Sequence, residues 1–79
     1  MIMFGDRLRL ARKRAGLSLR GLADRMGGRV TAQALSKYEA AQMFPSSSVL
    51  MALGKELGVS LDFLMSNQVE ELRSEEPHV

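Results

Sequence analysis

The sequence contains no cysteine and no tryptophan, and its single histidine, His78, is the next-to-last residue. Without cysteine the chain can form neither a disulfide nor a thiolate zinc site. No apolar run approaches the roughly 20 residues that a membrane-spanning helix needs. The opening Met-Ile-Met-Phe is followed too soon by Asp6 and Arg7 to be a signal peptide. We therefore expect a cytoplasmic protein that makes no contact with a membrane.

Residues that usually carry catalysis are equally scarce. The acidic residues are scattered along charged segments without a paired arrangement, and His78 is too close to the end to be a convincing catalytic base. No glycine-rich phosphate loop follows a predicted strand. The four aromatic residues are not interleaved with basic ones, which argues against a platform for single-stranded nucleic acid. We predict no enzymatic activity, no metal site, no cofactor and no small-molecule ligand.

Charge is distributed unevenly along the 79 residues, a length that allows one domain. Up to Val59 ten basic residues stand against four acidic ones, a net charge of +6. From Ser60 onward one basic residue stands against five acidic ones, a net charge of −4. Solvated helix faces explain any single one of these charges, but a basic excess of this size is typical of a surface that binds phosphates. We predict a domain over residues 1–65 and an acidic tail or linker over 66–79.

Apolar residues recur at helical spacing in five segments. In the first, Phe4, Leu8 and Ala11 follow one another at steps of four and three. A serine or threonine precedes each later segment, where its hydroxyl can cap a helix, and glycines follow several of them. The sequence therefore predicts an all-α chain without strands, whose helices run over about 3–15, 19–26, 31–40 and 47–57, with a fifth starting at Ser60.

The same spacing predicts which side chains form the core. These are Phe4, Leu8, Leu22, Ala23, Leu35, Tyr38, Leu50, Leu53, Leu57 and Leu64. Gly21, inside the second helix, suggests that another backbone passes close to it. Met43 and Phe44 lie in a loop, where they should either fold over the core or meet a partner. We favour the first of these two alternatives.

The segment over 30–40 has the character of a helix that reads another molecule. Leu35 and Tyr38 form one apolar edge, whereas Gln33, Ser36 and Lys37 lie on a different, polar face. That polar face contains no acidic residue. A polyanionic partner is therefore favoured over a protein partner.

Four sequence pieces occur in an order and spacing that resemble the Cro/C1-type helix-turn-helix domains of the xenobiotic-response-element regulators. They are L-x-x-A-R-x-x-x-G-L-S, L-A-D-R-M-G, V-T-x-x-x-L-S-K-Y-E and P-S-x-x-x-L-x-x-L-G-x-x-L-G-V-S, which begin at Leu8, Leu22, Val30 and Pro45. Together they cover about residues 4–65, and four pieces in register are much more specific than any one alone. The resemblance implies a compact five-helix, lambda-repressor-like domain with a helix-turn-helix at the second and third helices.

The resemblance also implies roles for individual residues. Contacts with DNA bases fall on Ala32, Gln33, Ser36 and Lys37. Contacts with DNA phosphates fall on Ser18, Arg20, Ser46, Ser47 and Ser48, and we add Arg29 from the turn before the third helix. An ion pair between Arg12 and Glu39 should tie the first helix to the third. The chain differs from the family pattern at Leu19, where a glutamine is common, at Gly54, where an alanine is common, and in a turn two residues longer at Gly27 to Arg29.

We therefore predict a transcriptional regulator that binds double-stranded DNA sequence-specifically, with a repressor favoured and a homodimer on paired half-sites. The dimer surface should include Val49, Met51, Phe63 and apolar positions from 65 to 72. One alternative is an antitoxin-like or protein-interaction module whose acidic tail binds a partner. Another is the N-terminal DNA-binding piece of a longer regulator, with a linker from Ser66 onward and a further C-terminal domain.

Overall fold

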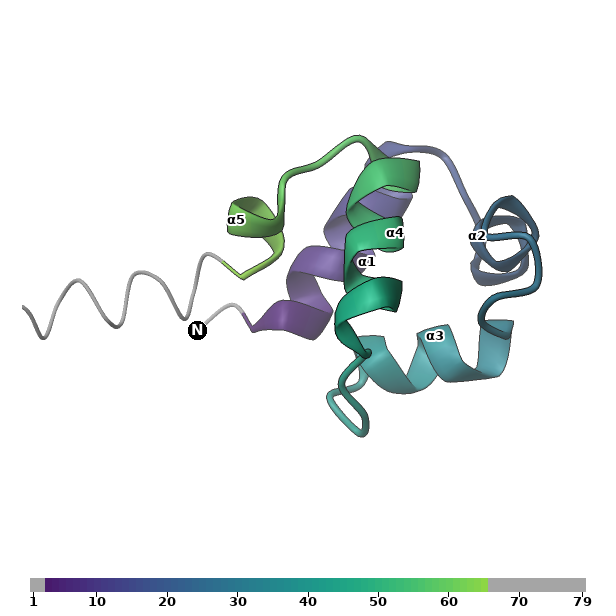
Figure 1. The fold of residues 1–79 in the computed structure, drawn as a ribbon, viewed down its shortest axis with the longest axis horizontal. Helices are drawn as coiled ribbons and strands as arrows, with labels where there is room; N and C mark the ends of the chain where they lie inside the picture. The colour runs from purple at the N-terminus through teal and green to yellow at the C-terminus, as the bar shows by residue number, and fades with distance from the viewer. Residues whose placement is uncertain (1–2, 66–79) are drawn as a thin grey trace, which may run out of the picture.

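The computed structural model describes residues 3–65 and is built from five α-helices (Figure 1). No strand occurs in this part of the chain, and none of its helices is long and apolar enough to cross a membrane. The predicted all-α architecture with five helices is confirmed. The helices are α1 (Phe4–Arg14), α2 (Leu19–Arg25), α3 (Ala32–Glu39), α4 (Ser47–Leu57) and α5 (Leu61–Leu64).

Side-chain caps set where the last four helices begin. The hydroxyl oxygens of Ser18, Thr31, Ser46 and Ser60 each accept a hydrogen bond from the backbone N–H three residues further on, at 2.9 to 3.3 Å. Each cap satisfies one of the N–H groups that a first helical turn leaves without a partner. The sequence signals for the four helix starts are therefore correct.

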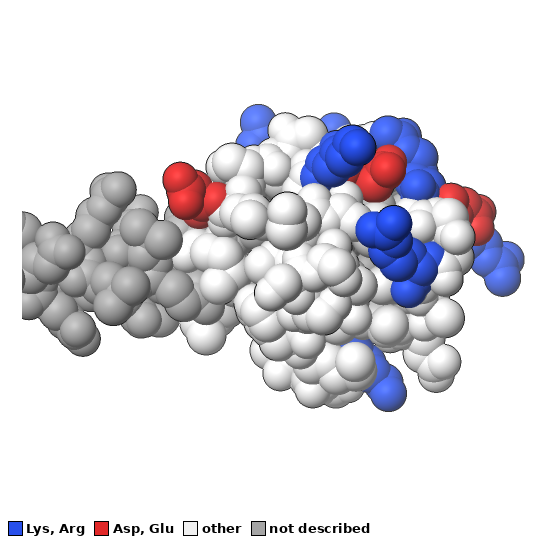
Figure 2. All heavy atoms as spheres, in the orientation of Figure 1, with Lys and Arg blue, Asp and Glu red and all other residues white. Residues whose placement is uncertain are grey.

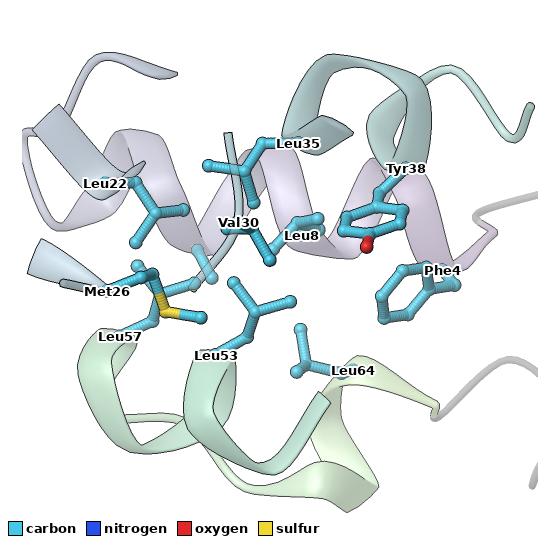
Figure 3. Packing of buried hydrophobic residues seen from close by; sticks show 11 residues of the cluster. Phe4, Leu8, Leu22, Met26, Val30, Leu35, Tyr38, Leu53, Leu57 and Leu64 are labelled. Carbon is cyan, nitrogen blue, oxygen red and sulfur yellow. The ribbon is translucent and has the colours of Figure 1, made fainter. Parts of the chain in front are cut away.

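One leucine from each helix meets in a single core. Leu8, Leu22, Leu35, Leu53 and Leu64 come from α1 to α5 in turn, and all five are fully buried. Figure 3 shows them pointing toward one another, with Phe4 and Tyr38 side by side at one end of the cluster. In Figure 1, α3 lies along the lower edge, α2 at one end of the molecule and α5 at the other. The core therefore contacts only one side of α3, and the opposite side of this helix lies at the surface.

Most of the predicted core is buried, with two exceptions. Ala23 and Leu50 are only half-buried and pack against the edge of the cluster. Three further buried apolar residues are outside the predicted set: Ala11 in α1, Met26 at the end of α2 and Val30 in the turn before α3. The last two lie at the two ends of the turn. They fill the space beneath the turn, so the turn itself is attached to the core.

Gly54 marks a close approach between two segments of the chain, but Gly21 does not. A Cβ on Gly21 would meet only the side chains of Ser18 and Leu17, so the expected neighbouring backbone is absent. A Cβ on Gly54 would lie 2.9 Å from the carbonyl oxygen of Val59, and the chain can fold back there because residue 54 is glycine.

Several apolar side chains outside the core differ from expectation. Phe44 stacks against Phe4 with ring centroids 4.8 Å apart, yet 54% of its surface remains exposed, as does 45% of Met43. The expectation that this loop folds over the core is therefore wrong for most of its surface. Of the residues expected on a dimer surface, Val49 and Phe63 are half-buried against the edge of the core cluster, whereas Met51 is 61% exposed. The positions from 66 to 72 lie outside the described residues.

Candidate nucleic-acid interface

The polar face of α3 is open to solvent. Leu35 and Tyr38 fix the opposite edge in the core, while Gln33, Ser36 and Lys37 are exposed. Within the described residues these three exposed side chains make no hydrogen bond and no ion pair. Ala32, the fourth expected base contact, is half-buried. The helix thus presents donors and acceptors that have no partner among residues 3–65.

The connection from α2 to α3 is long but anchored. Gly27 and Gly28 both adopt positive φ angles, of 68° and 82°, which residues with a side chain rarely adopt. After this loop Val30 returns to the core and Thr31 caps α3. The buried valine and the cap fix the N-terminal end of α3 in spite of the lengthened turn.

The C-terminal end of α3 is fixed by a buried ion pair with α1. Nε of Arg12 donates to Oε2 of Glu39 at 2.7 Å, and its Nη2 donates to Oε1 at 3.1 Å. The remaining Nη1 of Arg12 donates to the carbonyl oxygen of Leu17 at 2.9 Å. The Glu39 side chain is only 4% exposed. These hydrogen bonds to the carboxylate raise the pKa of Arg12 above its usual value, and two-pronged geometry of this kind orients both partners.

A second basic residue and a glycine complete this junction. Nε of Arg9 lies 3.5 Å from Oε1 of Glu39, but the Arg9 side chain is 59% exposed and contributes less to the pair. A Cβ on Gly5 would collide with the carbonyl oxygen of Glu39, so glycine is what allows α1 to pass against the last turn of α3. Sequence reasoning did not identify Gly5, and the available signal was a glycine inside an otherwise ordinary amphipathic helix.

The expected phosphate contacts lie at exposed positions around α3. Arg20 is in the first turn of α2, and Arg29 is in the turn before α3. Arg29 also lines a hollow of about 380 Å³ together with Lys55 from α4. The hydroxyls of Ser18 and Ser46 already act as helix caps, and Oγ of Ser46 also lies 3.4 Å from Oγ of Ser48, a hydrogen bond in which either hydroxyl can be the donor.

The start of α4 adds backbone donors to this set. Ser47 and Ser48 are exposed in its first turn, where helical N–H groups have no acceptor within the helix. In Figure 1, α4 begins at the lower edge of the molecule, the edge along which α3 runs. The structure therefore brings the start of α4 to the same side as α3.

Charge is concentrated at one end of the molecule. In Figure 2, Lys and Arg side chains gather over the end that contains α2 and over the upper edge, whereas the lower face near α3 is mostly uncharged. An exposed weak ion pair, with Nε of Arg25 at 3.7 Å from Oε1 of Glu56, also joins α2 to α4. The exposed face of α3 is thus a polar strip with basic groups toward α2, and basic groups of this kind attract phosphates.

Both the sequence and the fold match known proteins. A family model described as helix-turn-helix matches residues 8–64. The SPbeta prophage-derived uncharacterized HTH-type transcriptional regulator YonR of Bacillus subtilis (strain 168) is 41% identical over 63 residues, which make up 80% of this chain and 56% of that protein. The crystal structure of the P22 c2 repressor protein, in complex with synthetic operator 9T in the presence of Tl⁺, superposes with a TM-score of 0.75 at 31% identity. That match covers 82% of this chain and 96% of the repressor chain.

The chain belongs to the helix-turn-helix family and is of the Cro/C1 type, as its four sequence pieces predict. Its fold is that of the P22 c2 repressor protein. The chain spans about half, 56%, of the length of YonR. The base-contact and phosphate-contact assignments remain predictions.

Proposed function

We propose that this domain binds double-stranded DNA sequence-specifically as a cytoplasmic transcriptional regulator, and that it acts as a repressor by occupying its site. The observation that carries the proposal is the open polar face of α3, whose Gln33, Ser36 and Lys37 have no partner in the described chain. The YonR protein is named as a transcriptional regulator and the c2 protein as a repressor with an operator, which supports the same role. Binding alone suffices for it, so no catalytic step is proposed.

In this proposal α3 enters the major groove with its N-terminal end first. Gln33 makes two hydrogen bonds to N6 and N7 of an adenine, and Ala32 touches a thymine methyl group. Ser36 donates to a base edge, and Lys37 reaches a guanine or a phosphate. The exposure of Gln33, Ser36 and Lys37 and the partial exposure of Ala32 support these assignments.

Phosphates are held on the two flanks of α3. On one side Ser18, Arg20 and Arg29 meet the backbone of the duplex. On the other, the hydroxyls and free N–H groups of Ser46 to Ser48 receive a phosphate at the start of α4, where the helix dipole adds attraction. Arg12 and Glu39 touch no DNA and instead set the angle at which α1 holds α3.

The proposal includes a homodimer on two half-sites. About four base-facing side chains in one domain give a small interface, and a two-fold pair doubles both the contacts and the length of the recognised sequence.

Selection of bound sequences from a random duplex pool, followed by a salt titration, tests the proposed function. A regulator should enrich one motif, and its affinity should fall steeply with salt as counterions are released from the duplex. An antitoxin-like or protein-interaction module should show little duplex affinity even at low salt. An unenriched pool together with weak binding at low salt would reject DNA binding.

A further inference from the structure

Arg9 of α1 is a cation beside α3 that contributes little to the fold. Its Nε lies 3.5 Å from Oε1 of Glu39, and this side chain makes no other ion pair and no hydrogen bond within residues 3–65. Both carboxylate oxygens of Glu39 already accept shorter hydrogen bonds from Arg12, at 2.7 and 3.1 Å. The buried pair is therefore complete without Arg9, whose side chain is 59% exposed.

The junction between α1 and α3 holds more positive charge than it neutralises. Arg9 and Arg12 share the single negative charge of Glu39, so one positive charge is left over at the end of α3. Asp6, one turn earlier on α1, accepts a hydrogen bond from the backbone N–H of Met3 and makes no ion pair with Arg9 in the described part of the chain. The dipole at the end of α3 attracts a cation, but this attraction is small at an exposed position. The excess charge is therefore free to attract an anion outside the chain.

Arg9 lies on the side of α1 that faces α3. Gly5, one turn before Arg9 on the same side of α1, passes against the backbone of Glu39. Glu39 in turn follows Ser36 by one turn of α3, and Ser36 belongs to the exposed polar face of that helix. The exposed guanidinium of Arg9 thus lies near the level of the side chains that are proposed to contact bases. A duplex held against α3 brings phosphates close to it, because the sugar-phosphate backbone borders the major groove on both sides.

The other two arginines on the outer surface of α1 face α5 instead. The guanidinium of Arg7 lies over the ring of Phe63, 5.1 Å from the ring centroid. Arg14 lines a hollow of about 320 Å³ together with Phe63 and with the connection from α4 to α5. Arg14 is exposed and, like Arg9, has a charge that the described residues do not neutralise. These two arginines therefore differ mainly in the side of α1 on which they lie.

We propose that Arg9 is a further phosphate contact of this domain, and that it binds the sugar-phosphate backbone of the duplex beside the C-terminal end of α3. The contact rests on the proposed function, because it requires a duplex that lies along α3. On binding, the Arg9 guanidinium moves from Glu39 to a phosphate, whereas Arg12 keeps both of its hydrogen bonds to Glu39. Arginine suits this exchange, since its planar fork can bind two phosphate oxygens as well as a carboxylate. Such a contact adds affinity for every sequence and fixes the position of this end of α3 in the groove.

The salt dependence of binding to the selected duplex tests the contact. Arg9→Gln should lower the slope of log affinity against log salt concentration by about one unit, so its affinity deficit relative to the wild type should shrink about three- to fourfold between 50 and 200 mM salt. Arg14→Gln is the matched control, because it removes the same charge from the same helix, and it should keep the slope of the wild type. Arg9→Lys retains a cation and should restore the slope. Equal slopes for Arg9→Gln and Arg14→Gln would overturn the proposal.

Two further measurements separate a contact with DNA from a role in the fold. In urea unfolding, Arg9→Gln should shift the midpoint no more than Arg14→Gln does, because the Arg12–Glu39 pair stays intact. In a duplex whose phosphates are replaced one at a time by neutral methylphosphonates, one replacement should weaken binding of the wild type about two- to fivefold, as expected for an exposed ion pair. The same replacement should leave binding of Arg9→Gln unchanged. A loss of stability without a change in salt slope, or an identical response of the two proteins to every replacement, would overturn the contact.

Failure of this contact and failure of the proposed function give different results. A wild-type chain that enriches no motif and binds no duplex at low salt would reject both. A wild-type chain that enriches a motif, and whose salt slope is unchanged by Arg9→Gln, would reject the Arg9 contact alone.

Discussion

The two ends of α3 are built in opposite ways. At its N-terminal end the helix is held by the Thr31 cap and by the buried Val30 before it, and the exposed side chain of Gln33 has no partner in the described chain. At its C-terminal end the buried Glu39 makes two hydrogen bonds to Arg12, and the backbone passes against Gly5. The structure therefore places the ion pair and the close backbone approach at the C-terminal end of α3, opposite the end that carries Gln33.

This difference separates two kinds of residue that both look like ordinary surface positions in the sequence. Contacts at the C-terminal end set the angle of the helix, and their loss should cost stability. Side chains at the N-terminal end contribute little to the fold, and their loss should change what is bound. Variants at the two ends of α3 should therefore differ in whether they change stability or binding.

Glu39→Gln should destabilise the domain by about 3 kcal/mol or more, because it leaves the buried Arg12 guanidinium without a counter-charge. Urea unfolding measures the change. The matched control is Glu56→Gln, which breaks the exposed pair with Arg25 and should cost no more than about 1 kcal/mol. Equal losses in the two variants would mean that the buried pair does not fix α3.

Gly5→Ala should cost about 1 to 3 kcal/mol, because the added methyl group collides with the backbone of Glu39 and pushes α1 away from α3. Thermal unfolding reports the loss. Gly21→Ala is the control, since its methyl group meets only side-chain atoms, at 3.2 Å or more. A Gly5→Ala variant as stable as the wild type would show that the close approach is not tight in solution.

Gln33→Ala should leave stability nearly unchanged while relaxing the preference for one base pair, at a cost of about 1 to 3 kcal/mol on the preferred duplex. Arg20→Ala should instead weaken binding to all sequences alike. It should also lower the slope of log affinity against log salt concentration by about one unit. Binding to the selected duplex and to single-base variants distinguishes the two. If Arg20→Ala changes the preferred sequence and Gln33→Ala does not, the assignment of reading helix and phosphate clamp is wrong.

The parts of the fold that were predictable are those governed by local periodicity. Five leucines, one in each helix, follow from helical spacing alone, and so does the exposure of Gln33, Ser36 and Lys37. Val30 was missed because it lies in a turn, outside any periodic pattern, although it is buried. Periodicity identifies the face of a helix but cannot indicate where an irregular segment returns to the core.

Contacts between residues far apart in the sequence could not be predicted from local periodicity. Arg12 and Glu39 are 27 residues apart, and only the family resemblance suggested their pairing. Gly5 is a poor helix former inside a predicted helix, but this signal does not indicate which segment passes beside it, here the backbone of Glu39. The exposure of Met43 and Phe44 was likewise mispredicted, because burial of a loop depends on the direction in which the preceding helix ends.

Ala41 sets the direction in which the chain leaves α3, with a left-handed φ of 63°. The N–H groups of Ala41 and Gln42 donate to the carbonyl oxygens of Tyr38 and Lys37, at 3.2 and 2.9 Å. Hydrogen bonds of the same pattern, to the carbonyl oxygens three and five residues back, occur at the C-terminal ends of α1 and α4. There the left-handed residue is glycine, which is usual at a helix C-terminus.

Ala41→Gly should therefore stabilise the domain by about 1 kcal/mol. The substitution removes the steric cost of a left-handed alanine, and this gain exceeds the entropic cost of ordering a glycine on folding. Ala40→Gly is the matched control: this neighbouring alanine has a φ of −87°, so glycine gains nothing there and should destabilise slightly. Thermal unfolding of the two variants should shift the midpoint in opposite directions. A shift in the same direction for both would mean that Ala41 relaxes to a negative φ in solution, and with it the exposed position of Met43 and Phe44 would change.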